Sequence, residues 1–291
     1  MSQSINTNLA SLVAQRNMQG NQGAVSTSMQ RLSSGLRVNS AKDDAAGLAI
    51  AERMNAQVRG MNQAVRNSND GISMTQTVES ALGRASDALQ RMRELAVQSG
   101  NDSNTTSDRD SLDKEFGELA QEVQRVLGST TFNGKHVLGT DAQPTAGFKF
   151  QIGANTTTDD TITVFTKSMT TEPDIIAVAG ADNTGAGRAV IDNTADNTSI
   201  HTVMDNIDKA LDLINDERAT MGANQSRFES VISNLQSASE NQSAAKSRIM
   251  DADFAAETAN LSRAQILQQA GTAMLAQANQ QPQQVMKLLQ G

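Results

Sequence analysis

Proline is almost absent from this 291-residue chain, and the positions at which it occurs divide the sequence. The three prolines are Pro144, Pro173 and Pro282. Because proline costs about 3 kcal/mol in the interior of a helix, the long proline-free stretches can hold long helices. The sequence therefore predicts two helical arms on either side of a short mixed region.

Apolar residues in the first arm recur every three or four positions, which is the spacing of a coiled-coil-like seam. The early positions of this pattern are Ile5, Leu9, Leu12, Val25, Met29, Leu32 and Leu36. From residue 42 to residue 98 the spacing is continuous, and a helix of this length extends about 85 Å. A turn at 99–104 precedes a second helix, with Ser107 or Asp108 as its N-cap, which we expect to fold back antiparallel on the first.

The middle of the chain changes its period. Apolar residues alternate in 148–152 and 162–164, which predicts a β-hairpin over about 148–165, and Asn133-Gly134 is an additional tight-turn signal. Residues 166–200 are expected to form a loop, with one strand at most, at Ile175–Ala179. Five of the seven phenylalanines lie in 116–165, so we expect a compact core there, shared with the flanking helices.

The helical spacing returns at about residue 200 and continues to the end of the chain, interrupted only by Pro282. The terminal arms are amphipathic and too narrow to make a core alone, so the simplest arrangement pairs them with each other. Such a rod, with its termini together and its ends apolar, suggests assembly into open polymers. The alternative is a plain soluble helical bundle with frayed ends.

Composition excludes several classes of protein. The chain has no cysteine, tryptophan or tyrosine, so disulfide scaffolds and thiolate metal sites are excluded. Its two histidines, His136 and His201, are far apart in the sequence, which disfavours a metal centre. A net charge of −8 argues against binding to nucleic acid, and no apolar run approaches the length of a membrane span. No cleavable secretory signal is expected either.

Motifs for catalysis and cofactor binding are missing from the sequence. We find no nucleophile elbow and no phosphate-binding loop, and Gly185-Ala-Gly187 lacks the third glycine of a dinucleotide site. Asp43-Asp44 and Asp251-Ala-Asp253 are interpreted as helix starts. His136 is expected to be a solvated loop residue. The sequence therefore predicts no catalytic residue, cofactor or metal ion, and no enzyme.

Several long motifs, in order along the chain, resemble those of bacterial flagellin. They are QRLSSGLRVNSAKDDAAGLAI at 30–50, QRMRELAVQ at 90–98, FNG at 132–134, FQIGAN at 150–155, SRAQILQQAG at 262–271 and LAQAN at 275–279. The resemblance covers both arms and the hairpin, and leaves only about 166–200 without a counterpart.

The resemblance implies a structural filament subunit for motility, with an inner-tube domain (1–43 and 251–291) and a helical rod domain (44–250). No large outer domain is expected, since only about 35 variable residues lie between the halves. The residues expected to carry assembly are Ile5, Leu9, Leu12, Leu32, Leu36, Leu261, Leu267, Met274, Leu275, Leu288 and Leu289.

The resemblance also implies partners. The chain is expected to leave the cell unfolded through the flagellar export channel, to bind an export chaperone, and to polymerise next to cap and hook-filament junction proteins. The extracellular flagellum is its expected location, and membranes and nucleic acids are not expected partners.

Flagellins are also recognised by an animal Toll-like receptor, and the residues that match the recognition surface are Arg91, Leu95 and Glu115. Leu95 could equally be a seam residue and Arg91 a solvated one. Met92 replaces the valine that is common between the two arginines of this motif. Leu288 and Leu289 match leucines linked both to a cytosolic flagellin sensor and to inner-tube packing.

Two alternatives were weighed against the filament subunit. A hook-filament junction protein would share the terminal helices, but the continuous match through 30–50 and 90–98 disfavours it. A filament subunit with an inserted zinc protease needs a His-Glu-x-x-His helix, which this sequence lacks.

Overall fold

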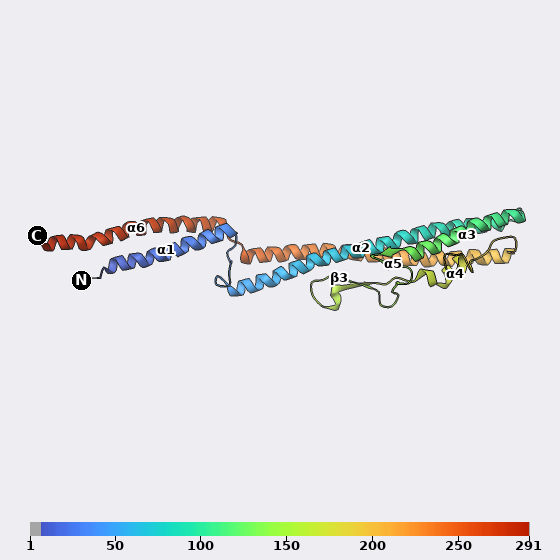
Figure 1. Ribbon diagram of the computed structural model, residues 1–291, viewed down its shortest axis with the longest axis horizontal. Helices are drawn as coiled ribbons and strands as arrows, with labels where there is room; N and C mark the ends of the chain where they lie inside the picture. Colours follow the sequence, from blue (N-terminus) through green and yellow to red (C-terminus); the bar gives the residue numbers. More distant parts are fainter. Residues whose placement is uncertain (1–6, 291) are drawn as a thin grey trace. The chain divides into compact units, whose positions relative to one another are not determined.

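The computed structural model describes residues 7–290, and the side chains of residues 7–280. Within this range the chain is mainly helical, with two small antiparallel sheets (Figure 1). The helices are α1 (Leu9–Ser34), α2 (Ala45–Ser99), α3 (Thr106–Ser129), α4 (Pro173–Ala179), α5 (Asn197–Met250) and α6 (Phe254–Gln290). The strands are β1 (Thr131–Phe132), β2 (Lys135–His136), β3 (Phe148–Gln151) and β4 (Thr161–Val164). The predicted fold class is confirmed.

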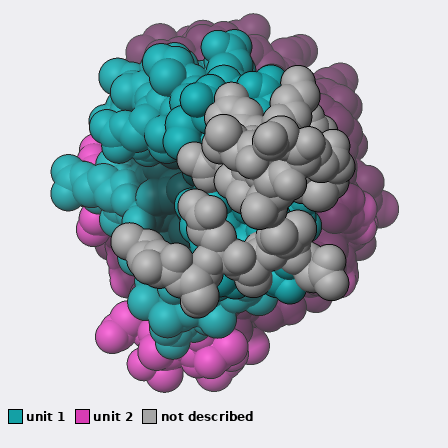
Figure 2. Space-filling model, turned by 90° about the vertical axis from the view of Figure 1, so that its left-hand side faces the viewer, with its two compact units in different colours: residues 1–58, 240–291 teal, residues 59–239 magenta. Residues whose placement is uncertain are grey.

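Contacts between residues divide the chain into two compact units (Figure 2). Unit 1 comprises residues 1–58 and 240–291, and unit 2 comprises residues 59–239. The helices α2 and α5 each contribute residues to both units. The sequence predicts domain boundaries at residues 43 and 251. These positions lie in the irregular connections between helices, inside unit 1.

Unit 1 pairs the two ends of the chain. Helices α1 and α6 lie side by side (Figure 1), as predicted for the terminal arms. Asn8 caps α1, because its Oδ1 accepts a hydrogen bond from the backbone N–H of Ser11 at 3.1 Å. The Nδ2 of Asn8 also donates to the carbonyl of Ala278 at 2.8 Å, which ties the start of α1 to α6.

A short backbone clip closes the other end of the α1–α6 pair. Gly35, in the left-handed conformation with φ 71°, ends α1, and its carbonyl accepts from the N–H of Ala252 at 2.9 Å. The N–H of Arg37 donates to the carbonyl of Met250 at 2.6 Å, and Leu36 forms a β-bridge with Asp251. The two connecting segments therefore hold each other by main-chain hydrogen bonds.

The aspartates beside these connections cap helices, as the sequence indicated. Asp44 accepts from the N–H of Gly47 at 2.8 Å at the start of α2, and Asp253 accepts from the N–H of Ala255 at 2.9 Å at the start of α6. Asp43 accepts from the N–H of Ser40 at 2.9 Å. Hydrogen bonds from Ser40 and Asn39 lower the pKa of Asp43 below its usual value.

Unit 2 contains the large side chains of the core. Helix α5 packs antiparallel to α2, as shown by the bonds Arg93–Asp208 at 2.6 Å and Gln225–Glu79 at 3.1 Å. The largest fully buried side chains are Met74, Leu82, Leu89, Met92, Leu95, Phe116, Leu127, Leu138, Ile162, Met169, Ile175 and Phe228. Gly71 allows the ring of Phe228 to lie against the α2 backbone, because a Cβ there would meet the ring at 2.6 Å.

The core is not concentrated in 116–165, and that prediction is wrong in its extent. Of the five phenylalanines in this stretch only Phe116 is completely buried, and Phe165 is 48 % exposed. The core instead draws on α2 from Met74 onward and on α5 as far as Phe228. Helices that cross the whole of a unit contribute apolar residues along their length, which a local count of aromatic residues does not reveal.

Helix α3 folds back as expected, but its predicted N-cap is wrong. Thr105 is the N-cap, and it forms a capping box with Asp108, whose backbone N–H donates to the Thr105 hydroxyl at 3.3 Å. The reciprocal hydrogen bonds from Thr105 lower the pKa of Asp108. Ser107 lies within the first turn of the helix.

Both sheets are hairpins. β1 and β2 are joined by Asn133 and Gly134, with φ of 49° and 78°, which are the left-handed values that an Asn-Gly turn supplies. β3 pairs with β4 from Phe148–Val164 to Gln151–Thr161, which confirms the hairpin predicted over 148–165. His136 belongs to β2 and is half-buried, with Nδ1 2.8 Å from the carbonyl of Gly128, so the prediction of a solvated loop residue is wrong.

The predicted strand at Ile175–Ala179 is wrong, because this stretch is the helix α4. Pro173 occupies its first turn, and Ile175, Val178 and Ala179 are buried on one face. The spacing of these three residues fits a helix better than a strand, and proline at the first helical position favours the helix.

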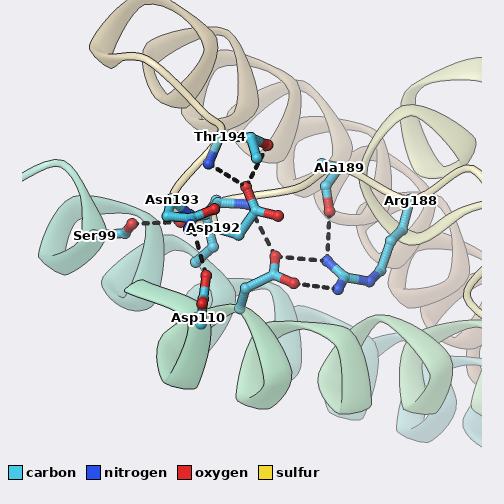
Figure 3. Close-up of polar contacts among 9 residues, drawn as sticks. Ser99, Asp110, Arg188, Ala189, Asp192, Asn193 and Thr194 are labelled. Atoms are coloured by element: carbon cyan, nitrogen blue, oxygen red, sulfur yellow. Dashed lines mark hydrogen bonds and ion pairs between the residues drawn. The ribbon is translucent and has the colours of Figure 1, made fainter. Parts of the chain in front are cut away.

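An ion pair fixes the segment that follows α4 (Figure 3). Arg188 binds the carboxylate of Asp113 on α3 through two nitrogens, with Nη1–Oδ1 at 2.9 Å, and its guanidinium lies over the ring of Phe116. The N–H of Ile191 also donates to Asp113 at 2.9 Å, and Ser99 donates to the carbonyl of Ile191 at 2.6 Å. The segment therefore covers the core of unit 2 although it has little regular structure.

Candidate assembly surfaces

The seam between α1 and α6 is made largely of small and polar residues. On α1 the half-buried or buried positions recur with alternating steps of three and four: Ser11, Ala14, Met18, Asn21, Val25, Ser28 and Leu32. On α6 the matching positions are Glu257, Leu261, Ala264, Gln268, Gly271, Leu275 and Ala278. This is a heptad pattern, and small side chains in it let the two helices approach closely.

Large apolar side chains of unit 1 lie outside this seam. Nine of the twelve exposed large apolar residues in the described part of the chain belong to unit 1. They are Leu9, Leu12, Val13, Met29, Ile50, Phe254, Ile266, Leu267 and Met274. The most exposed are Leu9 at 67 % and Ile266 at 65 %. Exposed apolar groups gathered in one region are typical of interaction sites, so unit 1 holds the candidate association surface.

Some of these residues share one groove on the α1–α6 pair. Leu9 and Val13 line it from α1, and Leu267 and Met274 line it from α6. Gly271 lies at its base beside Met18, whose Cβ is 4.0 Å from the position a glycine Cβ would take. A groove between two helices with apolar walls has the shape that accepts the apolar face of a further helix.

The structure separates the residues expected to carry assembly into two groups. Leu32, Leu36, Leu261 and Leu275 are half-buried within unit 1. Leu9, Leu12, Leu267 and Met274 are exposed, the least exposed of them at 47 %. Ile5 lies outside the described residues, and for Leu288 and Leu289 only the helical backbone of α6 is described.

Sequence reasoning did not single out Val13 and Ile266, which are 49 % and 65 % exposed. Val13 is adjacent to Ala14 of the seam, and Ile266 is adjacent to Leu267 of the predicted apolar series. For Val13, the signal that could have found it is the second, parallel series of small residues beginning at Ser11 and Ala14, because it shows that α1 has two faces of helical period.

Charge also differs between the units. Unit 1 carries nine Lys and Arg against seven Asp and Glu, whereas unit 2 carries 15 against 25. Copies of unit 2 therefore repel one another at neutral pH, and the repulsion is screened by salt.

The residues expected to meet a receptor occupy different environments in unit 2. Arg91 on α2 is half-exposed and bridges Glu115 on α3 at 2.8 Å and Glu94 at 2.8 Å. Hydrogen bonds from Glu94 and Glu115 raise the pKa of Arg91 above its usual value. Leu95 is completely buried, so it lies in the seam between the helices rather than on the surface. Only Arg91 and Glu115 can touch a partner directly.

None of the described His, Asp and Glu side chains form a group of three that could hold a metal ion. The half-buried His136 bonds to the end of α3 and has no acidic partner for its ring among the described residues.

The terminal helices match known families. The model for the bacterial flagellin N-terminal helical region matches residues 5–142, and that for the flagellin C-terminal helical region matches residues 204–289. The chain belongs to the bacterial flagellin family. Together the two matches cover α1, α2, α3 and nearly all of α5 and α6.

Curated flagellins resemble the chain over almost their full length. The flagellin of Halalkalibacterium halodurans is 45 % identical over 285 residues, which cover 98 % of this chain and 99 % of that protein. The flagellin of Bacillus subtilis is 41 % identical, with the same two coverages. A flagellar filament 33 kDa core protein of Treponema phagedenis is 40 % identical, again over 98 % and 99 %.

Among solved structures, a crystal structure of Bacillus cereus flagellin is 31 % identical and covers 62 % of this chain and 94 % of that chain, with a TM-score of 0.47. Flagellins are structural proteins of the extracellular filament, and membership of this family makes the chain a filament subunit for motility. The helices of the described region are too polar or too short to cross a membrane.

Proposed function

We propose that unit 1 provides the main surface through which copies of this filament subunit assemble. The observation that carries the proposal is the concentration of exposed large apolar side chains on α1 and α6. Leu9, Leu12, Leu267 and Met274 would be buried against neighbouring copies. Leu32, Leu36, Leu261 and Leu275 would hold the α1–α6 pair together, and Ile5, Leu288 and Leu289 would extend these surfaces.

The free energy for assembly would come from burial of these side chains. Burying a side chain of this size contributes about 1.5–3 kcal/mol, and several such contacts overcome the repulsion between the acidic units 2. A groove on one copy that accepts a helix face of the next is a heterologous contact. Heterologous contacts that do not close into a ring generate a helical polymer.

The domain division follows from the same proposal. Residues 1–43 and 251–291 would form the inner-tube domain, and residues 44–250 would form the rod domain. The support is the clip at 35–38 and 249–252, where regular helices give way to short connections. No large outer domain would be present, because residues 166–200 are held within unit 2 by α4 and by the Asp113–Arg188 pair.

A pair of matched variants tests the assembly surface. Val13→Ser on α1 and Val97→Ser on α2 replace the same side chain at positions that are 49 % and 53 % exposed. We expect Val13→Ser to raise the critical concentration for seeded polymerisation about tenfold, as loss of a buried valine would. Val97→Ser is the control and should change it little.

The readout is sedimentation of polymer together with negative-stain microscopy after addition of filament fragments. Equal critical concentrations for the two variants would place the main contact elsewhere. Wild-type protein that stayed monomeric with seeds would refute self-assembly altogether.

We further propose that the chain is exported unfolded and meets an export chaperone, the filament cap and hook-filament junction proteins. The resemblance to flagellin supports this, together with the lack of cysteine, which removes oxidation as a hazard. The chaperone would cover the apolar residues of α6, such as Leu267 and Met274, before assembly. Competition between chaperone and filament seeds for the same subunit would test this assignment.

Recognition by a Toll-like receptor is proposed for the Arg91–Glu115 pair, with Leu95 acting only by fixing α2 against the core. Arg91→Ala should reduce receptor signalling by monomers, while Arg93→Ala, at a neighbouring ion pair with Asp208, should leave it near the wild-type value. Equal signalling by both variants would remove Arg91 from the surface. For Leu288 and Leu289, helix packing is preferred over recognition by a cytosolic sensor.

A further inference from the structure

Glu217 is a buried acidic residue in the middle of α5. It is 3 % exposed and lies on the same face of the helix as Ile214 and Met221, which are completely buried. Acidic residues are rarely buried to this extent unless they are paired. A carboxyl group therefore occupies a position where α5 otherwise presents apolar side chains to the core of unit 2.

The hydrogen bonds of Glu217 are incomplete. Its carboxyl group accepts a hydrogen bond from the backbone N–H of Lys167, whereas Oε1 has no hydrogen-bond partner among the described residues. An ionised carboxylate needs several donors to replace its water, and one donor does not replace them. The site therefore suits the uncharged carboxyl group better than the carboxylate.

The partner of Glu217 belongs to segment 165–172, which connects β4 to α4. Thr166 and Met169 of this segment are completely buried. Its other bonds run to the 138–143 region: the N–H of Met169 donates to the carbonyl of Leu138 at 2.9 Å, and Thr166 accepts from the N–H of Gln143 at 3.2 Å. Lys167 ties this segment to α5 twice, through its backbone N–H to Glu217 and through its Nζ, which lies 3.7 Å from the carboxylate of Asp216.

The charged groups that face Glu217 come from α5 and from the segment itself. Lys167 favours the ionised form, but its Nζ lies 3.7 Å from the carboxylate of Asp216 and shares its charge with that residue. Asp216 and Glu172 disfavour a further negative charge. Burial is the largest influence, and together with these two carboxylates it raises the pKa of Glu217.

We propose that Glu217 is a pH-sensitive latch: the uncharged carboxyl group allows segment 165–172 to stay packed against α5, and the ionised group, which needs the water that this packing excludes, favours release of the segment. The latch belongs to unit 2 alone, so it does not depend on the proposed assembly surface. Release would expose Thr166 and Met169 and open the cover over the core beside α4.

The direction of the pH effect follows from linkage. The pKa of Glu217 is higher in the folded chain than in the open state, so the latch contributes fully at low pH and loses its contribution as pH rises through the folded pKa. Between the open-state pKa and the folded pKa, the equilibrium constant for opening should increase by up to about tenfold per pH unit, and above the folded pKa it should stay constant.

Hydrogen exchange of the full-length chain, read by mass spectrometry over a pH series, tests the latch. Exchange rates are corrected for the intrinsic effect of pH. The peptide that contains the Lys167 amide is then compared with a peptide from α3. For the wild type we expect protection of 165–172 to fall as pH rises, while protection of α3 stays constant. Protection of 165–172 that does not change with pH would overturn the proposal.

Two variants separate the latch from its surroundings. Glu217→Gln keeps the shape and cannot ionise, so its protection of 165–172 should be independent of pH. Glu229→Gln makes the same replacement at an exposed position of α5 and should keep the pH dependence of the wild type. If Glu217→Gln retained the full pH dependence, or Glu229→Gln abolished it, the titrating group would be another residue and the latch would be refuted.

Discussion

Units 1 and 2 use their large apolar side chains in opposite ways. All twelve of the largest fully buried side chains belong to unit 2, whereas most of the exposed large apolar residues belong to unit 1. In unit 1 the buried apolar residues are only Val38, Ala51 and Ala264 among the side chains described. From this difference we expect unit 2 to be stable as a monomer, and unit 1 to bury its exposed apolar side chains only in contact with other copies.

Deletion of residues 251–291 is the most severe test of this comparison. It removes α6 and with it every partner of the α1 seam, so we expect polymerisation to be abolished. Unit 2 keeps its core and should still unfold cooperatively on heating, as followed by circular dichroism. Loss of the cooperative transition in the truncated chain would show that the two units are not separately stable.

A pair of leucine truncations sharpens the comparison within the intact chain. Leu89 is completely buried in unit 2, so Leu89→Ala should lower the free energy of unfolding by about 2–5 kcal/mol. Leu261 is half-buried in unit 1, and Leu261→Ala should leave the main unfolding transition of the monomer unchanged but weaken polymerisation. Denaturant titration and seeded assembly measure the two effects. Similar losses of monomer stability in both variants would contradict the division.

A smaller effect is expected at the ion pair that fixes the segment after α4. Burial opposes ionisation of Asp113, but hydrogen bonds from Arg188 and from the N–H of Ile191 lower its pKa below the usual value. A carboxyl group whose pKa is lower in the folded chain than in the unfolded chain adds stability at pH values above the unfolded pKa. This stability is lost as the pH falls through the folded pKa. We expect Asp113→Asn to destabilise unit 2 by about 1–3 kcal/mol at neutral pH, with a smaller difference in acid.

The matched control is Asp102→Asn, since Asp102 is 84 % exposed and lies 3.4 Å from Arg109. It should change stability by less than about 0.5 kcal/mol. Thermal unfolding at several pH values measures both variants. An Asp113→Asn variant as stable as the wild type at neutral pH would mean that the segment is held by its apolar residues, such as Ile191, alone.

The helical elements could be predicted from the sequence because proline-free apolar periodicity is a local property. The 55-residue α2, the pairing of the ends and the hairpin at 148–164 were all predictable in this way. Which face of α1 meets α6 was not, because Leu9 and Ser11 begin two series with the same period. Only the partner helix α6 determines which face of α1 is buried. The face of small residues on α6 gives no hydrophobic signal in the sequence.

Leu95 was left between a recognition surface and a seam for a related reason. The match of Leu95 to a recognition surface came from a motif, and a motif does not report that the side chain points into the core. Glu217 gave no signal either, since an acidic residue within an amphipathic helix is ordinarily assigned to the solvent face. In both cases an element distant in the sequence determines the environment of the side chain: α3 for Leu95 and segment 165–172 for Glu217.

The clip between 35–38 and 249–252 has a consequence for the order in which the chain folds. Its bonds join residues such as Arg37 and Ile249, 212 positions apart, and the bond from Asn8 to Ala278 spans 270. Contacts this distant in sequence carry a high entropy of loop closure unless the intervening chain is already compact. We therefore expect unit 1 to close last, so that the first residues synthesised find their partners only after the last ones have arrived.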